Sequence, residues 1–237
     1  GCVRKISAAW VGNVITGSSY NFRRAVEGGS LEMEDHSNLT LAMALRAGAM
    51  GVPFMPARTA LGSDLFKTNA SLKTMTCPFS GETLTAVAAL KPDVAIVHLQ
   101  RADEFGNAHA WGNLGLTRDA CLASRRIIIT AEEIVDPDII SRDPNRVITP
   151  GYRVNAVAHA PWGGHPSPVP GYYNRDHQGF LDYRKESKTP RAYDDWKKKW
   201  VQSIQNWRGY AKLLGEQRMA ELAIKHHDYS EPVDYGY

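Results

Sequence analysis

Polar residues that could bind a ligand follow three apolar runs of the chain. Asn13 comes after the first run, Gly106 and Asn107 come after DVAIVHL at 93–99, and the stretch APWGGHP lies at 160–166. In an open α/β sheet such strand ends collect ligands, because their loops expose backbone N–H groups, and an asparagine amide can both donate and accept. These residues indicate a binding cleft. Gly-Asn is also a common turn pair, and a sharp reversal of the chain is the alternative interpretation of Gly-Gly-His-Pro.

Paired carboxylates follow the Ile-rich run 125–135, where Glu132 and Glu133 are adjacent. Two carboxylates can divide acid and base roles when their surroundings separate their pKa values. Neighbouring residues of a strand point to opposite faces, so these two do not share a site and only one of them can face a cleft. The acidic segment EMEDHSN at 32–38 is explained by a solvated strand end followed by a helix cap.

The chain contains none of the compact motifs that hold a phosphate, a dinucleotide or a serine nucleophile. Its eight histidines lack the spacing of metal ligands, and its three cysteines, Cys2, Cys77 and Cys121, are odd in number and unpatterned. We therefore expect no metal site and no disulfide framework, and a reducing cytoplasm as the location. The residues support a binding cleft more firmly than a complete catalytic apparatus on this chain.

The composition is that of an ordinary globular protein, with 43% hydrophobic and 22% charged residues among 237. The formal net charge of +3 is too small to indicate nucleic acid binding, and the one dense basic run, at 197–199, fits a solvated helix face. No apolar run approaches the roughly 18 residues that span a bilayer and no signal peptide is visible, so we expect no membrane partner. The chain opens without a methionine, and we expect its natural N-terminus to lie upstream.

Strand-like and helix-like patterns alternate along the chain, which predicts an α/β domain with a mostly parallel open sheet flanked by helices. The run 93–99 is expected to be a central strand buried on both faces. A Gly-, Pro- and Tyr-rich loop follows at 162–180, and an amphipathic helical segment covers 190–227 with an aromatic stripe typical of core or subunit contacts. The expected strands are 3–13, 31–35, 52–56, 93–99, 125–135 and two within 146–161, and the expected helices are 19–29, 39–50 with Ser37 or Asn38 as its cap, and 117–124.

Five segments, in this order, resemble the A subunit of family I CoA-transferases, and most of all that of the glutaconate CoA-transferases. They are LEMEDHS, GVPFMP, PDVAIVHLQRADEFGNAHAWG, TAEEIV and RVNAVAHAPWGGHPSPVPGYY. The resemblance runs through nearly the whole chain and includes the Trp-rich C-terminal helix. It implies a single A-subunit domain over residues 1–237, with the NagB/RpiA/CoA-transferase-like fold. The G-G-F loop that typical A subunits carry near their start is absent here, so we expect this chain to lack its N-terminal strands.

The resemblance also implies a reaction and its partners. Family I enzymes move CoA from an acyl-CoA to a free carboxylate through a covalent glutamyl-CoA thioester, and in two-subunit members the nucleophilic glutamate belongs to the B subunit. We therefore expect no catalytic residue on this chain, coenzyme A as part of the acyl-CoA substrate, and a small (di)carboxylic acid as acceptor. The expected partner is the B subunit, in a hetero-oligomer such as A2B2.

Carried onto this sequence, the resemblance assigns residues to the acyl or carboxylate pocket. The pocket is bordered by Asn13, Gln100, Gly106, Asn107, Trp111 and Gly112, and it is shaped or closed by Glu133, Gly163, Gly164 and His165.

Two other functions are compatible with the same fold. One is a hydrolase that opens the ring of a cyclic acyl-CoA in steroid degradation, in which an acidic residue near the start of the helix after the short strand contributes to the site. Here Asn38 or its neighbour stands in that place, and an amide cannot act as a general base, which favours the transferase. The other is a non-catalytic subunit that binds acyl-CoA.

Overall fold

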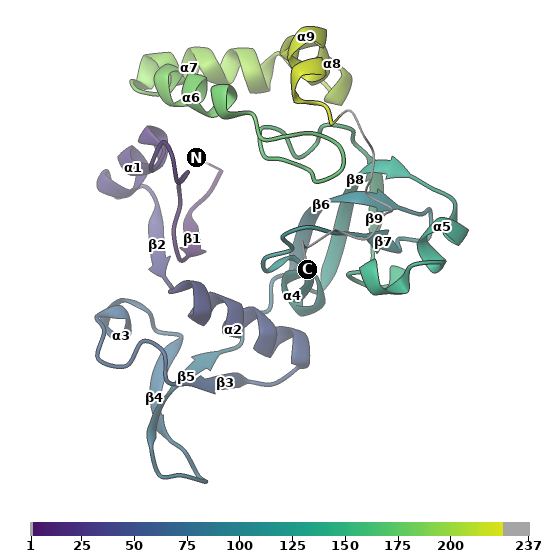
Figure 1. Cartoon of the computed structure of the whole chain (residues 1–237). Helices are drawn as coiled ribbons and strands as arrows, with labels where there is room; N and C mark the ends of the chain where they lie inside the picture. Colours follow the sequence, from purple (N-terminus) through teal and green to yellow (C-terminus); the bar gives the residue numbers. More distant parts are fainter. Residues whose placement is uncertain (1, 225–237) are drawn as a thin grey trace, which may run out of the picture. The chain divides into compact units, whose positions relative to one another are not determined.

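The structure, a computed structural model, describes residues 2–224, along which strands and helices alternate (Figure 1). The described chain forms two compact units. The first contains the residues up to 95 together with 115–126, and the second contains 96–114 together with the residues from 127 onward. The alternation confirms the predicted α/β class.

The first unit begins with a strand, a helix and a strand: β1 (Lys5–Ala8), α1 (Tyr20–Glu27) and β2 (Glu32–Asp35). β1 and β2 pair in parallel. A parallel pair needs a crossover connection, which α1 provides. All three are predicted elements, and each is shorter than its sequence pattern.

Helix α2 (Asn38–Met50) starts at a capping box. The Ser37 hydroxyl accepts a hydrogen bond from Thr40 N at 3.0 Å, and the Thr40 hydroxyl accepts one from Ser37 N at 2.9 Å. This exchange satisfies two backbone donors that the first turn would leave unpaired, so Ser37, rather than Asn38, is the cap. The helix packs against α4 (Thr117–Ala123) and ends at Gly51, whose φ of 74° is left-handed.

An antiparallel sheet completes the first unit, with strand order β3-β5-β4. The strands are β3 (Phe54–Ala57), β4 (Leu72–Thr76) and β5 (Thr83–Ala88), and the short helix α3 (Leu65–Thr68) precedes β4. The small core of this unit joins α2 to the sheet through Ala44, Leu72 and Val87. The sequence predicted β3, within 52–56, but not β4 or β5, because these strands are short and β4 is mostly exposed.

The second sheet has the strand order β7-β6-β8-β9 (Figure 1). Its strands are β6 (Val94–Ala102), β7 (Ala108–His109), β8 (Arg126–Ile134) and β9 (Ala156–His159). β8 and β9 run parallel, whereas β7 turns back antiparallel to β6. One face of β8 is apolar and fully buried through Ile127, Ile129 and Ala131.

Two predictions for this part of the chain are wrong in detail. The run 93–99 is not buried on both faces, since Ile96 is 73% exposed while Leu99 is buried. The segment 146–161 contains one strand, β9, and not two. Its first part carries only an isolated bridge between Val147 and His109, because short 3-10 turns bend the backbone on either side.

Helices make up most of the described residues after 176. They are α6 (His177–Glu186), α7 (Pro190–Lys197), the π-helical turn Lys198–Gln202, α8 (Trp207–Leu214) and α9 (Glu216–Leu222), and the short α5 (Pro137–Ser141) precedes them. The segment 190–227, predicted as helical, thus contains three helices up to Leu222, and its last residues, 225–227, lie outside the described part. None of the helices between residues 2 and 224 combines the length and the apolar character needed to cross a membrane.

Candidate functional site

A buried carboxylate, Glu132 on β8, organises the second unit. Only 3% of its side chain is exposed. Its Oε1 accepts from Tyr173 Oη and pairs with His98 Nε2, both at 2.6 Å, and its Oε2 accepts from Trp162 N at 2.8 Å. A buried carboxylate is costly unless it is hydrogen-bonded, and here both oxygens are engaged.

His98 on β6 connects this carboxylate to the strand beside it. Because a carboxylate only accepts, His98 Nε2 donates to Glu132, and His98 Nδ1 lies 2.9 Å from the Thr130 hydroxyl. Thr130 and Glu132 are two residues apart on β8 and so point to the same face of the sheet. Thr130 and Glu132 therefore lie on one face of β8, and Ile127, Ile129 and Ala131 lie on the other.

The loop after β9 lies directly on this cluster. A Cβ at Gly163 would come within 2.7 Å of the His98 ring, and one at Gly164 within 3.2 Å of the same ring. Gly164 N donates to Tyr173 Oη at 2.9 Å, and the Trp162 ring stacks on the Tyr173 ring at 4.3 Å between centroids. The two glycines are required here by close approach, which is a physical reason for the Gly-Gly pair.

Tyr173 is locked as a hydrogen-bond donor. Burial raises the pKa of its phenol, and the adjacent Glu132 carboxylate raises it further. The hydroxyl therefore stays protonated at physiological pH, donates to Glu132 and accepts from the loop.

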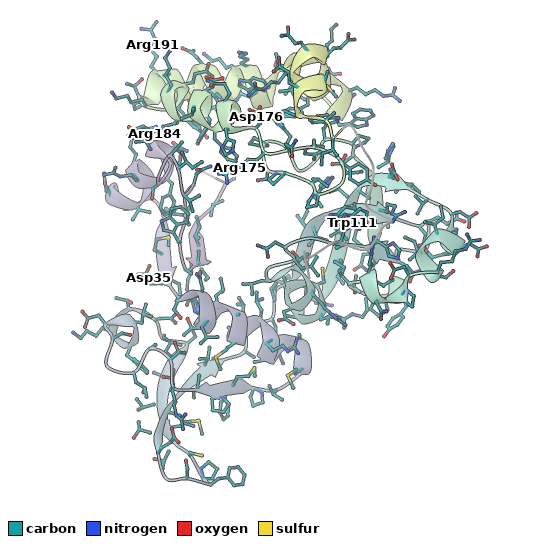
Figure 2. The ribbon with its side chains drawn as sticks, viewed as in Figure 1. Asp35, Trp111, Arg175, Asp176, Arg184 and Arg191 are labelled. Atoms are coloured by element: carbon teal, nitrogen blue, oxygen red, sulfur yellow. The ribbon has the colours of Figure 1, made fainter. Side chains whose placement is uncertain are left out.

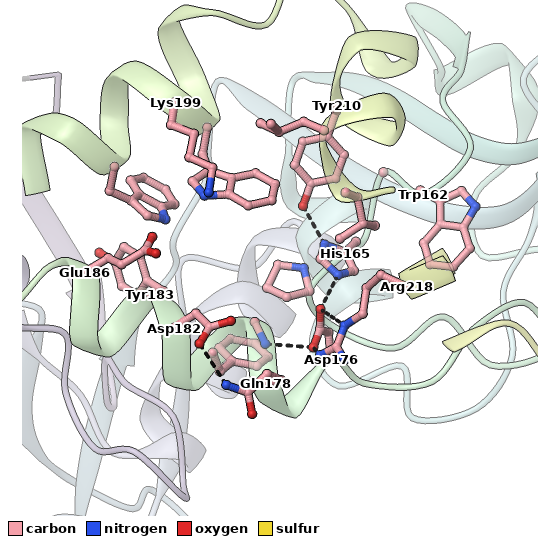
Figure 3. A pocket seen from close by; sticks show the side chains of 18 of the residues that line it. Trp162, His165, Asp176, Gln178, Asp182, Tyr183, Glu186, Lys199, Tyr210 and Arg218 are labelled. Carbon is pink, nitrogen blue, oxygen red and sulfur yellow. Dashed lines mark hydrogen bonds and ion pairs between the residues drawn. The ribbon is translucent and has the colours of Figure 1, made fainter. Parts of the chain in front are cut away.

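A second cluster, centred on His165, lies at the other end of the same loop (Figure 3). His165 Nε2 is 2.9 Å from Asp176 Oδ2, and His165 Nδ1 is 2.5 Å from Tyr210 Oη. Arg218 pairs with both oxygens of Asp176, and the same carboxylate caps α6 by accepting from Gly179 N at 2.7 Å. The side chains of His165 and Asp176 are 4% and 2% exposed, so this is a buried ion-pair network.

Burial and pairing set the protonation states of this cluster. Burial lowers the pKa of His165, more than its contact with Asp176 raises it, which favours the neutral imidazole. Burial alone would raise the pKa of Asp176, but its hydrogen bonds from Arg218, Gly179 and His165 hold that pKa below the usual value. Burial raises the pKa of Tyr210 to about 12.

Both the loop and the His165 cluster border a cavity of about 860 Å³. Its wall is built from the loop 161–166 and helices α6 to α9, and seven of its twenty lining residues are Trp, Tyr or Phe (Figure 3). Aromatic walls with a few convergent polar groups are typical of small-molecule sites. The lining residues are Pro161, Trp162, Gly163, His165, Pro166, Asp176, Gln178, Gly179, Phe180, Asp182, Tyr183, Glu186, Trp196, Lys199, Trp200, Trp207, Tyr210, Leu213, Leu214 and Arg218.

Of the residues predicted from sequence, Gly163 and His165 line this cavity, and Gly164 lies behind it against Tyr173. Glu133 does not join Glu132. It is half-buried on the opposite face of β8, and the carboxylate that is buried in the polar cluster is Glu132.

The polar turn after β6 is held together by its own groups. Asp103, which is buried, accepts from the backbone N–H groups of Phe105 and Asn107 at 2.9 Å and from the Asn107 amide at 2.8 Å. The Asn107 side-chain oxygen accepts from Gly151 N at 2.9 Å. Gly106 has a φ of +89° and would place a Cβ 2.7 Å from Val154. Asn107 thus bridges the turn to the segment at 151–154.

Gln100 and the Trp111–Gly112 pair lie together beside the loop 169–173. The Gln100 amide donates to Trp111 O at 3.0 Å and approaches Pro170 O at 3.5 Å. The guanidinium groups of Arg101 and Arg146 lie 5.1 and 5.3 Å from the centroid of the Trp111 ring, which is labelled in Figure 2. A Cβ at Gly112 would meet the Pro170 ring at 2.8 Å. These three predicted residues fix the base of the loop.

The two remaining predicted residues, Asn13 and Asn38, belong to the first unit. The Asn13 side chain accepts from Ile15 N at 2.9 Å and from Thr16 N at 3.3 Å, which closes a turn on itself. Asn38 is the exposed first residue of α2.

The segment EMEDHSN is less solvated than predicted. The helix cap is present, but His36 and Asn69 are buried at 6% and 1% exposure. The Asn69 amide donates to Asp35 O at 2.8 Å and lies 3.2 Å from His36 Nε2, while His36 Nδ1 is 3.2 Å from the Thr40 hydroxyl. Burial lowers the pKa of His36, so this cluster holds a neutral imidazole.

Sequence reasoning missed most of the two clusters. Glu132 and His98 had a signal, since each is a polar residue at an alternate position of an apolar strand. Asp176, Tyr210 and Arg218 had none, because they are brought together from three separate segments. Within residues 2–224, no group of three or more His, Cys, Asp or Glu side chains is arranged to hold a metal ion.

Comparison with known proteins agrees with the fold and gives it a family. The sequence profile described as "Coenzyme A transferase" matches residues 1–160. The chain is 38% identical over 219 residues to the A subunit of 3-oxoadipate CoA-transferase from Pseudomonas knackmussii, a match that covers 91% of this chain and 77% of that protein. It is 30% identical over 202 residues to the IpdA subunit of a cholesterol ring-cleaving hydrolase from Rhodococcus jostii, a match that covers 80% of this chain and 68% of that protein.

A solved structure matches most of this chain. The crystal structure of glutaconate coenzyme A-transferase from Acidaminococcus fermentans superposes with a TM-score of 0.90 and 33% identity, over 94% of this chain and 76% of that chain.

Proposed function

The chain belongs to the coenzyme A transferase family, and on this basis we propose that it is the A subunit of a heteromeric enzyme that moves CoA from an acyl-CoA to a small (di)carboxylic acid. The observation that carries the proposal is the similarity to an A subunit of such an enzyme over 91% of the chain. The proposed partners are a B subunit, in an assembly such as A2B2, and the acyl-CoA and carboxylate substrates. The proposed location is the cytoplasm.

The hydrogen bonds of Glu132 are consistent with the proposal that the nucleophilic glutamate belongs to another chain. In this reaction a glutamate carboxylate attacks the thioester carbonyl, and CoA is held on that glutamate before it passes to the acceptor. A nucleophilic carboxylate needs a free oxygen that can reach the carbonyl. Both oxygens of Glu132 are held by His98, Tyr173 and Trp162, so Glu132 is suited to support a loop and not to attack.

We propose that the loop 161–166 and the aromatic cavity contact the acyl group. Gly163 and Gly164 let this loop pack tightly on His98, and His165 is fixed by Asp176 and Tyr210. A wall that is rigid before the substrate arrives loses little entropy on binding. Gln100 and Gly112 lie against Pro170, and with Trp111 they are proposed to hold the segment that follows this loop.

A hydrolase that opens the ring of a cyclic acyl-CoA is the second candidate function, because this chain is 30% identical to the IpdA subunit of a cholesterol ring-cleaving hydrolase. The two reactions differ in the fate of CoA. A transferase moves CoA to a new acid, whereas a ring-opening hydrolase adds water across a ring bond of the acyl group and leaves its CoA thioester in place.

Co-expression with the partner subunit tests the proposal. The purified complex is incubated with acetyl-, succinyl- or glutaryl-CoA and a second carboxylate, and thioesters are followed by mass spectrometry. The transferase produces a new acyl-CoA, and borohydride reduction of the intermediate marks a glutamate on the B subunit. Free CoA without a new thioester, or a mark on this chain, would contradict the proposal.

A further inference from the structure

Three side chains at the wall of the cavity form a hydrogen-bonded chain, which runs from the hydroxyl of Tyr210 through the imidazole of His165 to the carboxylate of Asp176. Tyr210 Oη lies 2.5 Å from His165 Nδ1, and His165 Nε2 lies 2.9 Å from Asp176 Oδ2. Asp176 can only accept, so Nε2 carries the ring proton and Nδ1 accepts the phenol proton. A hydroxyl hydrogen-bonded to an imidazole that a carboxylate orients is the arrangement by which enzymes move a proton to and from a substrate.

The surroundings keep this hydrogen-bonded chain fixed. The Tyr210 ring contacts Trp200 edge-on, at 6.0 Å between centroids, and the His165 ring at 5.7 Å. Arg218 also donates to the Asp176 carboxylate, through Nε to the oxygen that faces His165, and Gly179 N donates to the other oxygen. All three members of the hydrogen-bonded chain border the cavity, so a ligand in the cavity lies beside the phenol.

Tyr173 shows what a purely structural tyrosine looks like in the same unit. Its hydroxyl is saturated by Glu132 and Gly164 N, and it does not line the cavity. The Tyr210 hydroxyl has His165 as its hydrogen-bond partner and keeps a lone pair that a ligand can approach.

We propose that Tyr210 is a proton-transfer residue of the aromatic cavity, with His165 and Asp176 as the relay behind it, and that it exchanges a proton at the carbon next to an acyl thioester carbonyl. The inference rests on the proposed function, since the ligand is taken to be an acyl-CoA.

The step balances without any further reactant. The α-carbon loses a proton to Tyr210 Oη as the phenol proton passes to His165 Nδ1, and the C–H electron pair becomes the enolate of the thioester. The His165 imidazolium is stabilised by the Asp176 carboxylate at 2.9 Å. The positive charge of this imidazolium, behind the Tyr210 phenol, in turn stabilises the enolate. The reverse transfer returns a proton to carbon, so nothing is oxidised or reduced.

Deuterium exchange tests this inference on the complex of the chain with its partner subunit. The complex is incubated in D2O with acetyl-, succinyl- and glutaryl-CoA, and deuterium at the α-carbon is measured by mass spectrometry against protein-free samples. We expect exchange above the protein-free rate with at least one of them. We expect Tyr210→Phe, which keeps the ring and removes only the hydroxyl, to slow it by about 10²- to 10⁴-fold, the usual contribution of a positioned acid or base.

Tyr193→Phe is the matched control. Tyr193 lies on α7 with its ring stacked on Trp196 and is not among the cavity residues, so its variant is expected to exchange at the native rate. His165→Gln breaks the relay behind an intact phenol and should also slow exchange. Circular dichroism and the midpoint of thermal unfolding report whether each variant is folded.

The outcomes separate the two proposals. CoA transfer without deuterium exchange, or native exchange in Tyr210→Phe, overturns the proton relay and leaves the transferase intact. Deuterium exchange without CoA transfer supports the relay and overturns the proposed function.

Discussion

Glu132 Oε1 and His98 Nε2 lie 2.6 Å apart on neighbouring strands, with 3% and 15% of their side chains exposed. The same carboxylate accepts from the Tyr173 hydroxyl and from Trp162 N, so one buried residue holds two strands and the loop after β9. The cavity wall depends on this junction, because Trp162 stacks on Tyr173 and faces the cavity.

Replacing Glu132 with glutamine is expected to destabilise the fold. The amide has the same shape but only one acceptor oxygen, so its NH2 group is placed against a donor, Tyr173 or Trp162. A buried donor left unsatisfied costs about 1–3 kcal/mol. We expect the Glu132→Gln free energy of unfolding, measured by urea titration, to fall by that amount. Glu133→Gln, on the half-buried neighbour, should change it by less than about 0.5 kcal/mol; equal effects of the two variants would refute the central role of Glu132.

Glu132 and Glu133 illustrate which part of this site can be predicted from the sequence. Alternation along β8 predicts that they face opposite sides, and the Ile-rich face opposite Thr130 marks the strand as a core strand. Which face is sealed depends on Tyr173 and on the loop at 162–164, which come from more than 25 residues away along the sequence. Strand periodicity carries no information on that covering segment, so the buried partner could not be chosen.

Distance along the chain limits prediction of the His165 cluster in the same way. Its carboxylate precedes α6, its phenol lies on α8 and its arginine on α9. None of these residues has a local motif, because a hydrogen bond across three helices leaves no mark on spacing. The loop PWGGHP could be singled out from the sequence as a candidate site, because it follows a predicted strand, and its contact with a ligand stays a prediction.

Adding one methyl group to the loop provides a second prediction. In Gly163→Ala the new Cβ would lie 2.7 Å from the His98 ring, which is itself fixed by Glu132 and Thr130. We expect a loss of about 1–3 kcal/mol of unfolding free energy from overpacking. The matched variant is Gly209→Ala in α8, where the nearest atom would be at 3.7 Å. It should be neutral or stabilise by up to about 1 kcal/mol, since alanine favours a helix. Thermal unfolding of both variants tests the pair, and a stable Gly163→Ala protein would contradict the close approach.

The dependence of stability on pH provides a third prediction. Burial lowers the pKa values of His36, His109 and His165. When the folded pKa lies below the unfolded value of about 6.5, the unfolded state binds the proton first as pH falls. Stability is therefore full above the unfolded pKa and decreases as pH drops from about 7 toward 5, by up to about 1.4 kcal/mol per pH unit for each histidine.

Urea unfolding at pH 7, 6 and 5 measures this slope. Carboxylates contribute little in this window, because their usual pKa values are near 4. Replacing His109, which is buried against Ile140 O, with glutamine should make the slope shallower, by at most about one proton. A native protein equally stable at pH 7 and pH 5 would rule out three neutral buried imidazoles.

The ion pair between Arg218 and Asp176 provides the last prediction. The Asp176 side chain is 2% exposed, whereas that of Arg218 is 30% exposed, so only one end of the pair is fully desolvated. Removing the guanidinium in Arg218→Met leaves a buried carboxylate with its remaining donors, Gly179 N and His165. Breaking a fully buried pair costs about 3–5 kcal/mol, and partial hydration of the arginine reduces this to about 2–3 kcal/mol.

The dependence of stability on pH distinguishes an electrostatic role of Arg218 from a packing role. In the native protein the pKa of Asp176 is below the usual value, so its stabilisation is present above the unfolded pKa and is lost only as pH falls through the lower folded pKa. Without Arg218 the folded pKa rises, and stability should begin to fall at a higher pH than in the native protein. Arg218→Lys keeps the charge but not the bidentate contact, so its stability should begin to fall at a pH between those of the native protein and Arg218→Met. Acid unfolding curves of all three proteins test the order, and coincident curves would mean that Arg218 acts through packing alone.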